Sequence, residues 1–85
     1  MESIFSRPTP KNLPWNEIES LLRAIGCKAI EGAGSRVSFR YKIEHEDRQA
    51  EVIQGDFHRP HPGKEAKPYL VRKVAAFLTK IGQLP

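Results

Sequence analysis

Hydrophobic residues recur at helical spacing in two parts of the chain. Pro14 suits the first position of a helix and Gly26 suits a C-terminal cap, so the first helix is predicted between them. The same argument predicts a second helix from Pro68 to Gly82. Each predicted helix has an apolar stripe that would face a core: Trp15, Ile18, Leu21, Leu22 and Ile25 in the first, and Leu70, Val74, Phe77, Leu78 and Ile81 in the second.

Three β-strands are predicted between the helices. The clearest runs from Ser35 to Ile43, where hydrophobic side chains alternate with polar ones, so that one face joins the core and the other is cationic. A shorter strand is predicted at 28–31 and a third at 50–57, and these are joined to it by a glycine-rich turn and a polar loop. Gly55 in the third strand indicates a bulge or an early strand end.

The order helix, three strands, helix predicts one α+β domain. Two helices can cover one face of a three-stranded antiparallel sheet and leave the other face in solvent. Residues 1–13, with two prolines and no apolar period, are predicted to form an extended arm, and residues 14–85 the folded domain. The chain of 85 residues has no room for a separate cofactor-binding domain. The arrangement resembles that of a double-stranded-RNA-binding domain.

Positive charge is concentrated in two parts of the chain, whose formal net charge is +4. Residues 34–43 carry three cations and no acid, and residues 58–85 carry six cations against one acid. Such clustering is typical of a protein that binds a polyanion, and a merely solvated basic face is the alternative.

Other features concern the compartment of the protein. No apolar run is long enough to span a bilayer, and the N-terminus lacks the layout of a secretory signal. The single cysteine, Cys27, has no partner for an intramolecular disulfide and is predicted to be a small buried hydrophobic residue. These features together predict a soluble cytoplasmic protein with no membrane partner.

Two histidines lie in a proline-rich loop that leads into the last helix. Proline restricts the backbone, so a stiff loop presents both imidazoles. Histidine exchanges protons near neutral pH and neighbouring cations bind phosphate, which predicts acid–base chemistry on a nucleic-acid backbone. In metal-independent RNA cleavage, one group takes the proton of the attacking 2′-hydroxyl and another protonates the leaving oxygen. The candidate catalytic residues are His58 and His61, and the candidate RNA-binding residues are Arg36, Arg40, Lys42, Arg59, Lys64 and Lys67.

This part of the chain also offers two further candidate sites. The free N–H groups that open the last helix are a candidate anion site. A His-x-x-His spacing with Asp56 nearby supplies ligand types that zinc accepts. Pro60 between the histidines does not guarantee that they converge, however, and no cysteine or further histidine clusters with them. We therefore predict neither a metal ion nor another cofactor.

Two segments are informative in combination. Gly34-Ser35 opens the alternating strand, and the final helix is preceded by His58-Arg59-Pro60-His61-Pro62-Gly63-Lys64-Glu65. With this combination the sequence resembles the HicA family of bacterial toxins over residues 14–82. The loop and its place before the helix are the more specific part of the resemblance. The resemblance implies a fold like that of double-stranded-RNA-binding domains, cleavage of mRNA, and inhibition by a HicB-type antitoxin.

One position departs from the family pattern. Many members have Gly-Ser-His-x-x-Phe at the start of that strand, with the histidine as the catalytic residue, whereas this chain has Arg36 there. Arginine stays protonated, so it can hold a phosphate but cannot transfer protons. Either His58 or His61 then takes the catalytic role, or the protein binds RNA without cutting it. His61 matches the histidine before Pro-Gly-Lys-Glu in the family's loop, and we rank His58, at the strand end, above it.

Two functions other than catalysis stay open. A non-catalytic RNA-binding module would bind RNA with an affinity that falls as salt is added, and would give no cleavage products. A protein–protein adaptor would use the basic face to dock an acidic partner.

Overall fold

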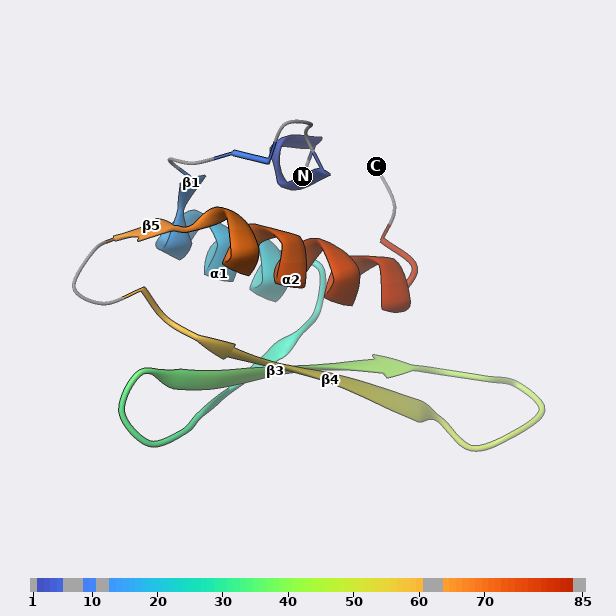
Figure 1. Ribbon diagram of the computed structural model, residues 1–85. Helices are drawn as coiled ribbons and strands as arrows, with labels where there is room; N and C mark the ends of the chain where they lie inside the picture. The colour runs from blue at the N-terminus through green and yellow to red at the C-terminus, as the bar shows by residue number, and fades with distance from the viewer. Residues whose placement is uncertain (1, 6–8, 11–12, 61–63, 84–85) are drawn as a thin grey trace.

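The computed structural model describes residues 2–5, 9–10, 13–60 and 64–83. Within these ranges the chain forms two α-helices, a three-stranded sheet and several short elements (Figure 1). In chain order these are η1 (Glu2–Phe5, a 3-10 helix), β1 (Leu13–Pro14), α1 (Trp15–Ala24), β2 (Lys28–Glu31), β3 (Arg36–Ile43), β4 (Glu51–His58), β5 (Glu65–Ala66) and α2 (Pro68–Lys80).

The main sheet has the strand order β2-β3-β4, and both pairs of neighbouring strands are antiparallel. On β3 the predicted alternation is present: Val37 and Phe39 are buried, whereas Arg36, Arg40 and Lys42 are exposed. Both α-helices lie on the same face of the sheet (Figure 1). The predicted α+β architecture, with two helices on one face of an antiparallel sheet, is therefore confirmed, and the other face is left to solvent.

Both helices bury the apolar stripe that their sequences predict. Helix α1 begins one residue later than predicted, because Pro14 has extended backbone angles and precedes the helix as its N-cap. The helix ends at Ala24, and Gly26 takes a φ of 107°, a conformation open to glycine, as the chain turns toward β2. The buried side chains of the two helices form one core with the inner face of the sheet: Trp15, Ile18 and Leu22 from α1, and Leu70, Val71, Val74, Phe77 and Leu78 from α2.

Gly55 lies in the part of β4 that contacts α2. The strand continues through Gly55, which pairs with Phe39, so the predicted bulge or early strand end is wrong. The missing side chain serves packing instead, because a Cβ atom there would lie 2.7 Å from Cδ1 of Phe77. Phe77 packs edge-on against Phe57, with ring centroids 5.8 Å apart. Glycine thus lets the aromatic core approach the strand closely.

The sequence predicts an extended arm for residues 1–13, but the described part of this segment is not uniformly extended. It includes the short helix η1, and Ile4 within it is buried in the main core. It also includes β1, which pairs antiparallel with β5. The N–H group of Trp15 donates to the carbonyl of Lys64 at 2.9 Å, so the start of α1 is tied to the segment before α2. The domain boundary near residue 13 stays a prediction.

Candidate functional site

The outer face of the sheet carries the predicted basic row. Arg36, Arg40 and Lys42 are exposed along β3. Lys28 on β2 is the cross-strand partner of Arg40 and is also exposed, so both side chains lie on the same face. The Arg40 Nε donates to the side-chain oxygen of Gln54 at 2.7 Å, which holds its guanidinium against the sheet. The charges gather on the face that the helices leave open, and such a surface fits a polyanion.

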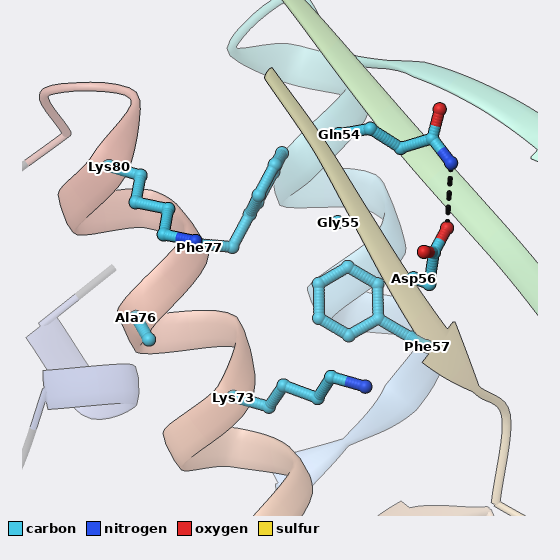
Figure 2. Close-up of a pocket in the computed structure, with 8 residues that line it drawn as sticks. All are labelled: Gln54, Gly55, Asp56, Phe57, Lys73, Ala76, Phe77 and Lys80. Atoms are coloured by element: carbon cyan, nitrogen blue, oxygen red, sulfur yellow. Dashed lines mark hydrogen bonds between the residues drawn. The ribbon is translucent and has the colours of Figure 1, made fainter.

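An ionised carboxylate lies among these cations. Asp56 on β4 accepts hydrogen bonds from the hydroxyl of Ser38 at 2.6 Å and from the amide of Gln54 at 2.8 Å, the latter drawn in Figure 2. The Ser38 hydroxyl, followed by the Gln54 amide, lowers the pKa of Asp56 below its ordinary value. The carboxylate therefore stays charged at neutral pH and interrupts the positive face.

A surface hollow of about 470 Å³ lies at the end of the sheet where β3 begins and β4 ends. Arg36 and His58 are direct cross-strand partners there. Such partners have Cβ atoms about 5 Å apart on the same face, so the guanidinium and the imidazole are neighbours. Ser38 and Asp56 from the strands and Lys73 from α2 also line the hollow. One predicted catalytic histidine and one predicted phosphate-binding arginine thus lie in a common site.

Lys73 is a residue of this hollow that sequence reasoning did not single out. Its Nζ lies 5.7 Å from the centroid of the Phe57 ring. Figure 2 shows its side chain reaching from α2 toward β4. The available signal was its place beside the buried Val74, at the border of the apolar stripe of the helix. The sequence thus places Lys73 at the edge of the apolar stripe of α2, but it does not show that this side of the helix faces the end of β4.

Arg59, which was predicted to bind phosphate, forms ion pairs within the protein. Its Nε lies 2.7 Å from a carboxylate oxygen of Glu19, and its Nη1 lies 2.6 Å from one of Glu31. Hydrogen bonds to Glu31 and then to Glu19 raise the pKa of Arg59 above its ordinary value. With two carboxylates on one guanidinium, the geometry favours a structural role for Arg59 over binding of RNA.

Glu19 is the buried carboxylate of this network. Burial raises its pKa, but hydrogen bonds from Arg59 and from the indole of Trp15, together with the charges of Arg59 and Arg23, outweigh burial, so the pKa lies below its ordinary value of 4.5. The main-chain N–H of Arg59 also donates to the carbonyl of Ser35 at 2.8 Å. The network therefore ties the segment after β4 to α1, to β2 and to the start of β3.

The remaining predicted residues belong to the segment between β4 and α2. His61 falls outside the described residues, so its placement relative to His58 stays a prediction. Lys64 and Lys67 are both exposed. The carbonyl of Lys67 accepts hydrogen bonds from two N–H groups in the first turn of α2. Since Pro68 carries no N–H and that of Leu70 is already bonded, the first turn keeps few free N–H groups for the anion site predicted at the start of this helix.

Three further observations bear on the predicted chemistry and compartment. The part of the chain that the structure describes contains no group of three or more His, Cys, Asp or Glu side chains placed to hold a metal ion. Within that same part, neither helix is long and apolar enough to cross a membrane. Cys27 is buried, as predicted, and burial raises the pKa of its thiol to about 11.

Comparison with known proteins adds a family assignment. A family model described as the HicA toxin of bacterial toxin-antitoxin matches residues 15–82. Searches of curated proteins and of solved structures give no match. The matched segment contains both α-helices, the whole main sheet and the hollow that Arg36 and His58 line. Since it spans most of the chain, the protein belongs to the HicA family of toxins from bacterial toxin–antitoxin systems.

Proposed function

We propose that this toxin is an endoribonuclease that cleaves mRNA without a metal ion and is neutralised by a HicB-type antitoxin. The observation that carries the proposal is the pairing of His58 with Arg36 across the strands, in a hollow that also contains Lys73. A group that can transfer a proton thus lines the same hollow as two cations, which is a combination that RNA cleavage by transesterification uses.

The proposed reaction forms one bond and breaks another at the same phosphorus. The 2′-hydroxyl oxygen attacks the adjacent phosphate as a base takes its proton, and the 5′-oxygen leaves as an acid supplies one. His58 is assigned one of these proton transfers and His61 the other. The family's usual histidine position holds Arg36, which cannot transfer protons. We therefore assign the proton transfer to His58, the cross-strand partner of Arg36 on β4.

The cations of the site are proposed to bind the phosphates of the RNA. Arg36 and Lys73 approach the hollow from the sheet and from α2, so they can contact the same phosphate from two sides. They would stabilise the negative charge that grows on the non-bridging oxygens during attack. Arg40 and Lys42, further along β3, would hold the neighbouring phosphates of the strand, and Lys64 and Lys67 are proposed to hold the RNA beyond the hollow.

The experiment that tests the proposal is induced expression of the protein beside His58→Ala and His61→Ala variants. Growth and the integrity of a reporter mRNA are followed. His45→Ala is the matched control, since His45 lies in the loop at the opposite end of the β3–β4 hairpin. We expect the parent and the control to fragment the message, and His58→Ala to cleave purified RNA at least about a hundredfold more slowly. Intact message with the parent would contradict the proposal.

A second function, RNA binding without cleavage, is favoured by one observation. Arg36 replaces the proton-transferring residue of the family while keeping a positive charge, which preserves phosphate binding but removes that residue's chemistry. On this reading the parent and His58→Ala would bind a labelled RNA equally well, and neither would produce fragments. A filter-binding titration run beside the cleavage assay separates the two functions.

The antitoxin part of the proposal has its own test. The family assignment implies an antitoxin partner, and we assign it to the HicB type. Co-expression of a HicB-type protein encoded beside the toxin should restore growth and co-purify with it. Failure to co-purify would contradict this assignment without affecting the cleavage result.

A further inference from the structure

Strand β4 forms an edge of the main sheet, because the strand order is β2-β3-β4. The N–H of Arg59 donates to the carbonyl of Ser35 at 2.8 Å, so these two residues are a hydrogen-bonded pair of the β3–β4 ladder. This pair shows which residues of β4 bond to β3 and which do not. In an antiparallel pair the bonded residues alternate with residues whose main-chain groups point away from the partner. The register therefore directs the N–H and C=O groups of Gln54, Asp56 and His58 to the free edge.

This edge borders a groove against α2. The groove, about 220 Å³ in volume, is lined on one side by β4 from Gln54 to Phe57 and on the other by α2. Figure 2 shows Lys73 and Lys80 projecting from α2 toward the strand, with Phe77 between them. Within the described residues, no hydrogen bond from outside the sheet reaches the edge groups of β4.

Most proteins protect such an edge. Proline, a bulge, a very short strand, a covering segment or charged side chains at the edge discourage pairing with another chain. Lys73 and Lys80 beside this edge disfavour a basic or apolar strand, whereas they attract an acidic one. Strand β4 is eight residues long, contains no proline and pairs with β3 in unbroken register. An open edge of this length is suited to accept another strand.

We propose that the free edge of β4 docks an extended acidic segment of a protein partner, which adds a fourth strand to the sheet. The added strand would exchange main-chain hydrogen bonds with Gln54, Asp56 and His58. Acidic side chains at alternate positions of that strand would turn toward α2 and meet Lys73 and Lys80, because successive side chains of a strand point to opposite faces.

A polypeptide fits this edge better than RNA does. The edge offers donors and acceptors in alternation along a straight line, which is the pattern that a β-strand presents in return. An RNA backbone offers acceptors at its phosphates and a donor only at each 2′-hydroxyl, so it does not present the regular alternation of donors and acceptors at strand spacing that the edge groups match. The two lysines alone would attract either polyanion, whereas the main-chain array selects the peptide.

Docking at this edge would also regulate the proposed nuclease. Asp56, Phe57 and Lys73 line both the groove and the hollow that contains His58. A strand in the groove would occupy Lys73 and cover one side of that hollow. This consequence rests on the proposed function, whereas strand addition does not.

The test uses the full-length protein and a synthetic peptide of alternating Val and Glu residues. Amide hydrogen exchange is measured by NMR with and without the peptide. We expect exchange at Gln54, Asp56 and His58 to slow by about tenfold or more when the peptide is bound, because edge amides gain partners. A peptide with the same sequence but N-methylated alternate amides should fail to protect them.

Two pairs of variants locate the site. Gln54→Pro removes the outward N–H, whereas Gln54→Ala removes the same side chain and keeps that N–H, so only the proline variant should lose binding. Reversal of both groove lysines, Lys73→Glu with Lys80→Glu, should weaken binding about tenfold, since attraction at two exposed contacts becomes repulsion. The matched control reverses Lys28 and Arg48, which lie outside the groove, and should keep the parent affinity.

Several outcomes would overturn the proposal. These are absence of binding, protection at amides other than those of β4, equal binding of the N-methylated peptide, or equal effects of the two charge reversals. Slowing of the same amides by a 2′-O-methyl RNA oligonucleotide, with none by the peptide, would assign the groove to nucleic acid instead. All of these measurements can be made whether or not the protein cleaves RNA, so failure here is distinct from failure of the proposed function.

Discussion

Gly55→Ala probes the contact between the sheet and α2 with the addition of one methyl group. The glycine lies opposite Phe39 in β4. A Cβ at this position would lie 2.7 Å from Cδ1 of Phe77 and 2.9 Å from Cζ of Phe57. Both distances are shorter than carbon–carbon contact allows, so a ring or the strand has to move.

Two opposing effects decide the sign of the change. Replacement of glycine by alanine restricts the unfolded chain and stabilises a protein by about 0.4–1 kcal/mol where the native site is compatible. Overpacking of a well-filled core costs about 1–3 kcal/mol. Phe57 and Phe77 are only 1% and 4% exposed, so neither ring has open space into which to turn. We therefore expect a net loss of about 1–2 kcal/mol, which corresponds to a fall in Tm of about 5–10 °C in a domain of this size.

The assay is equilibrium unfolding in urea, followed by far-UV circular dichroism and by the fluorescence of Trp15. Gly55→Ala is measured alone, Phe77→Leu alone, and the two together. The double variant should recover about 1 kcal/mol relative to the sum of the single changes, since the smaller side chain makes room for the methyl group. Gly34→Ala is the control: its φ of 62° makes alanine unfavourable, but no atom lies within 4 Å, so Phe77→Leu should not rescue it.

Two results would refute this reasoning. Stability equal to or above that of the parent for Gly55→Ala would show that the core yields without cost. A purely additive double variant would show that the loss, if present, comes from somewhere other than the ring of Phe77.

Other predictions concern the charged network, the thiol and the basic face. Arg59→Ala should destabilise the protein by about 2 kcal/mol in urea unfolding, because it removes the main partner of the buried Glu19 carboxylate. The pKa of Glu19 is lowered in the fold, so its contribution is complete above its ordinary value of 4.5 and is lost as the pH falls through the folded pKa. Arg59→Ala should therefore flatten the acid limb of a stability–pH curve, and an unchanged limb would contradict this. Cys27, with a thiol pKa of about 11, should resist iodoacetamide at pH about 8 in the folded protein and react once urea is added, as mass spectrometry would show. Arg36→Gln should weaken RNA binding and lower the slope of log affinity against log salt by about 0.7, the loss of one phosphate contact; an unchanged slope would remove Arg36 from the interface.

Local patterns in the sequence were sufficient for the two helices, the three strands of the main sheet and their exposed faces, but not for η1, β1 and β5. Strict alternation along β3 places Arg36, Arg40 and Lys42 on one side because successive strand residues point to opposite faces, and the structure agrees. The apolar stripes place both helices against a core for a similar reason. The loop histidines were visible as titratable groups among cations before any geometry was known, and His58 does lie in a hollow beside Arg36.

Tertiary structure decided which charged residues are free and which are occupied. Arg59 looks like its basic neighbours in the sequence, yet its guanidinium pairs with Glu19, 40 positions away on α1. The sequence does not indicate that Lys73 lies beside Asp56 and Phe57, because this depends on how α2 packs against β4. Gly55 suggested a bulge, whereas its small size accommodates a ring from α2. In each case the deciding contact joins elements far apart in the chain. A periodic pattern shows which face of an element is buried, but the partner of that face is settled only when the elements pack together.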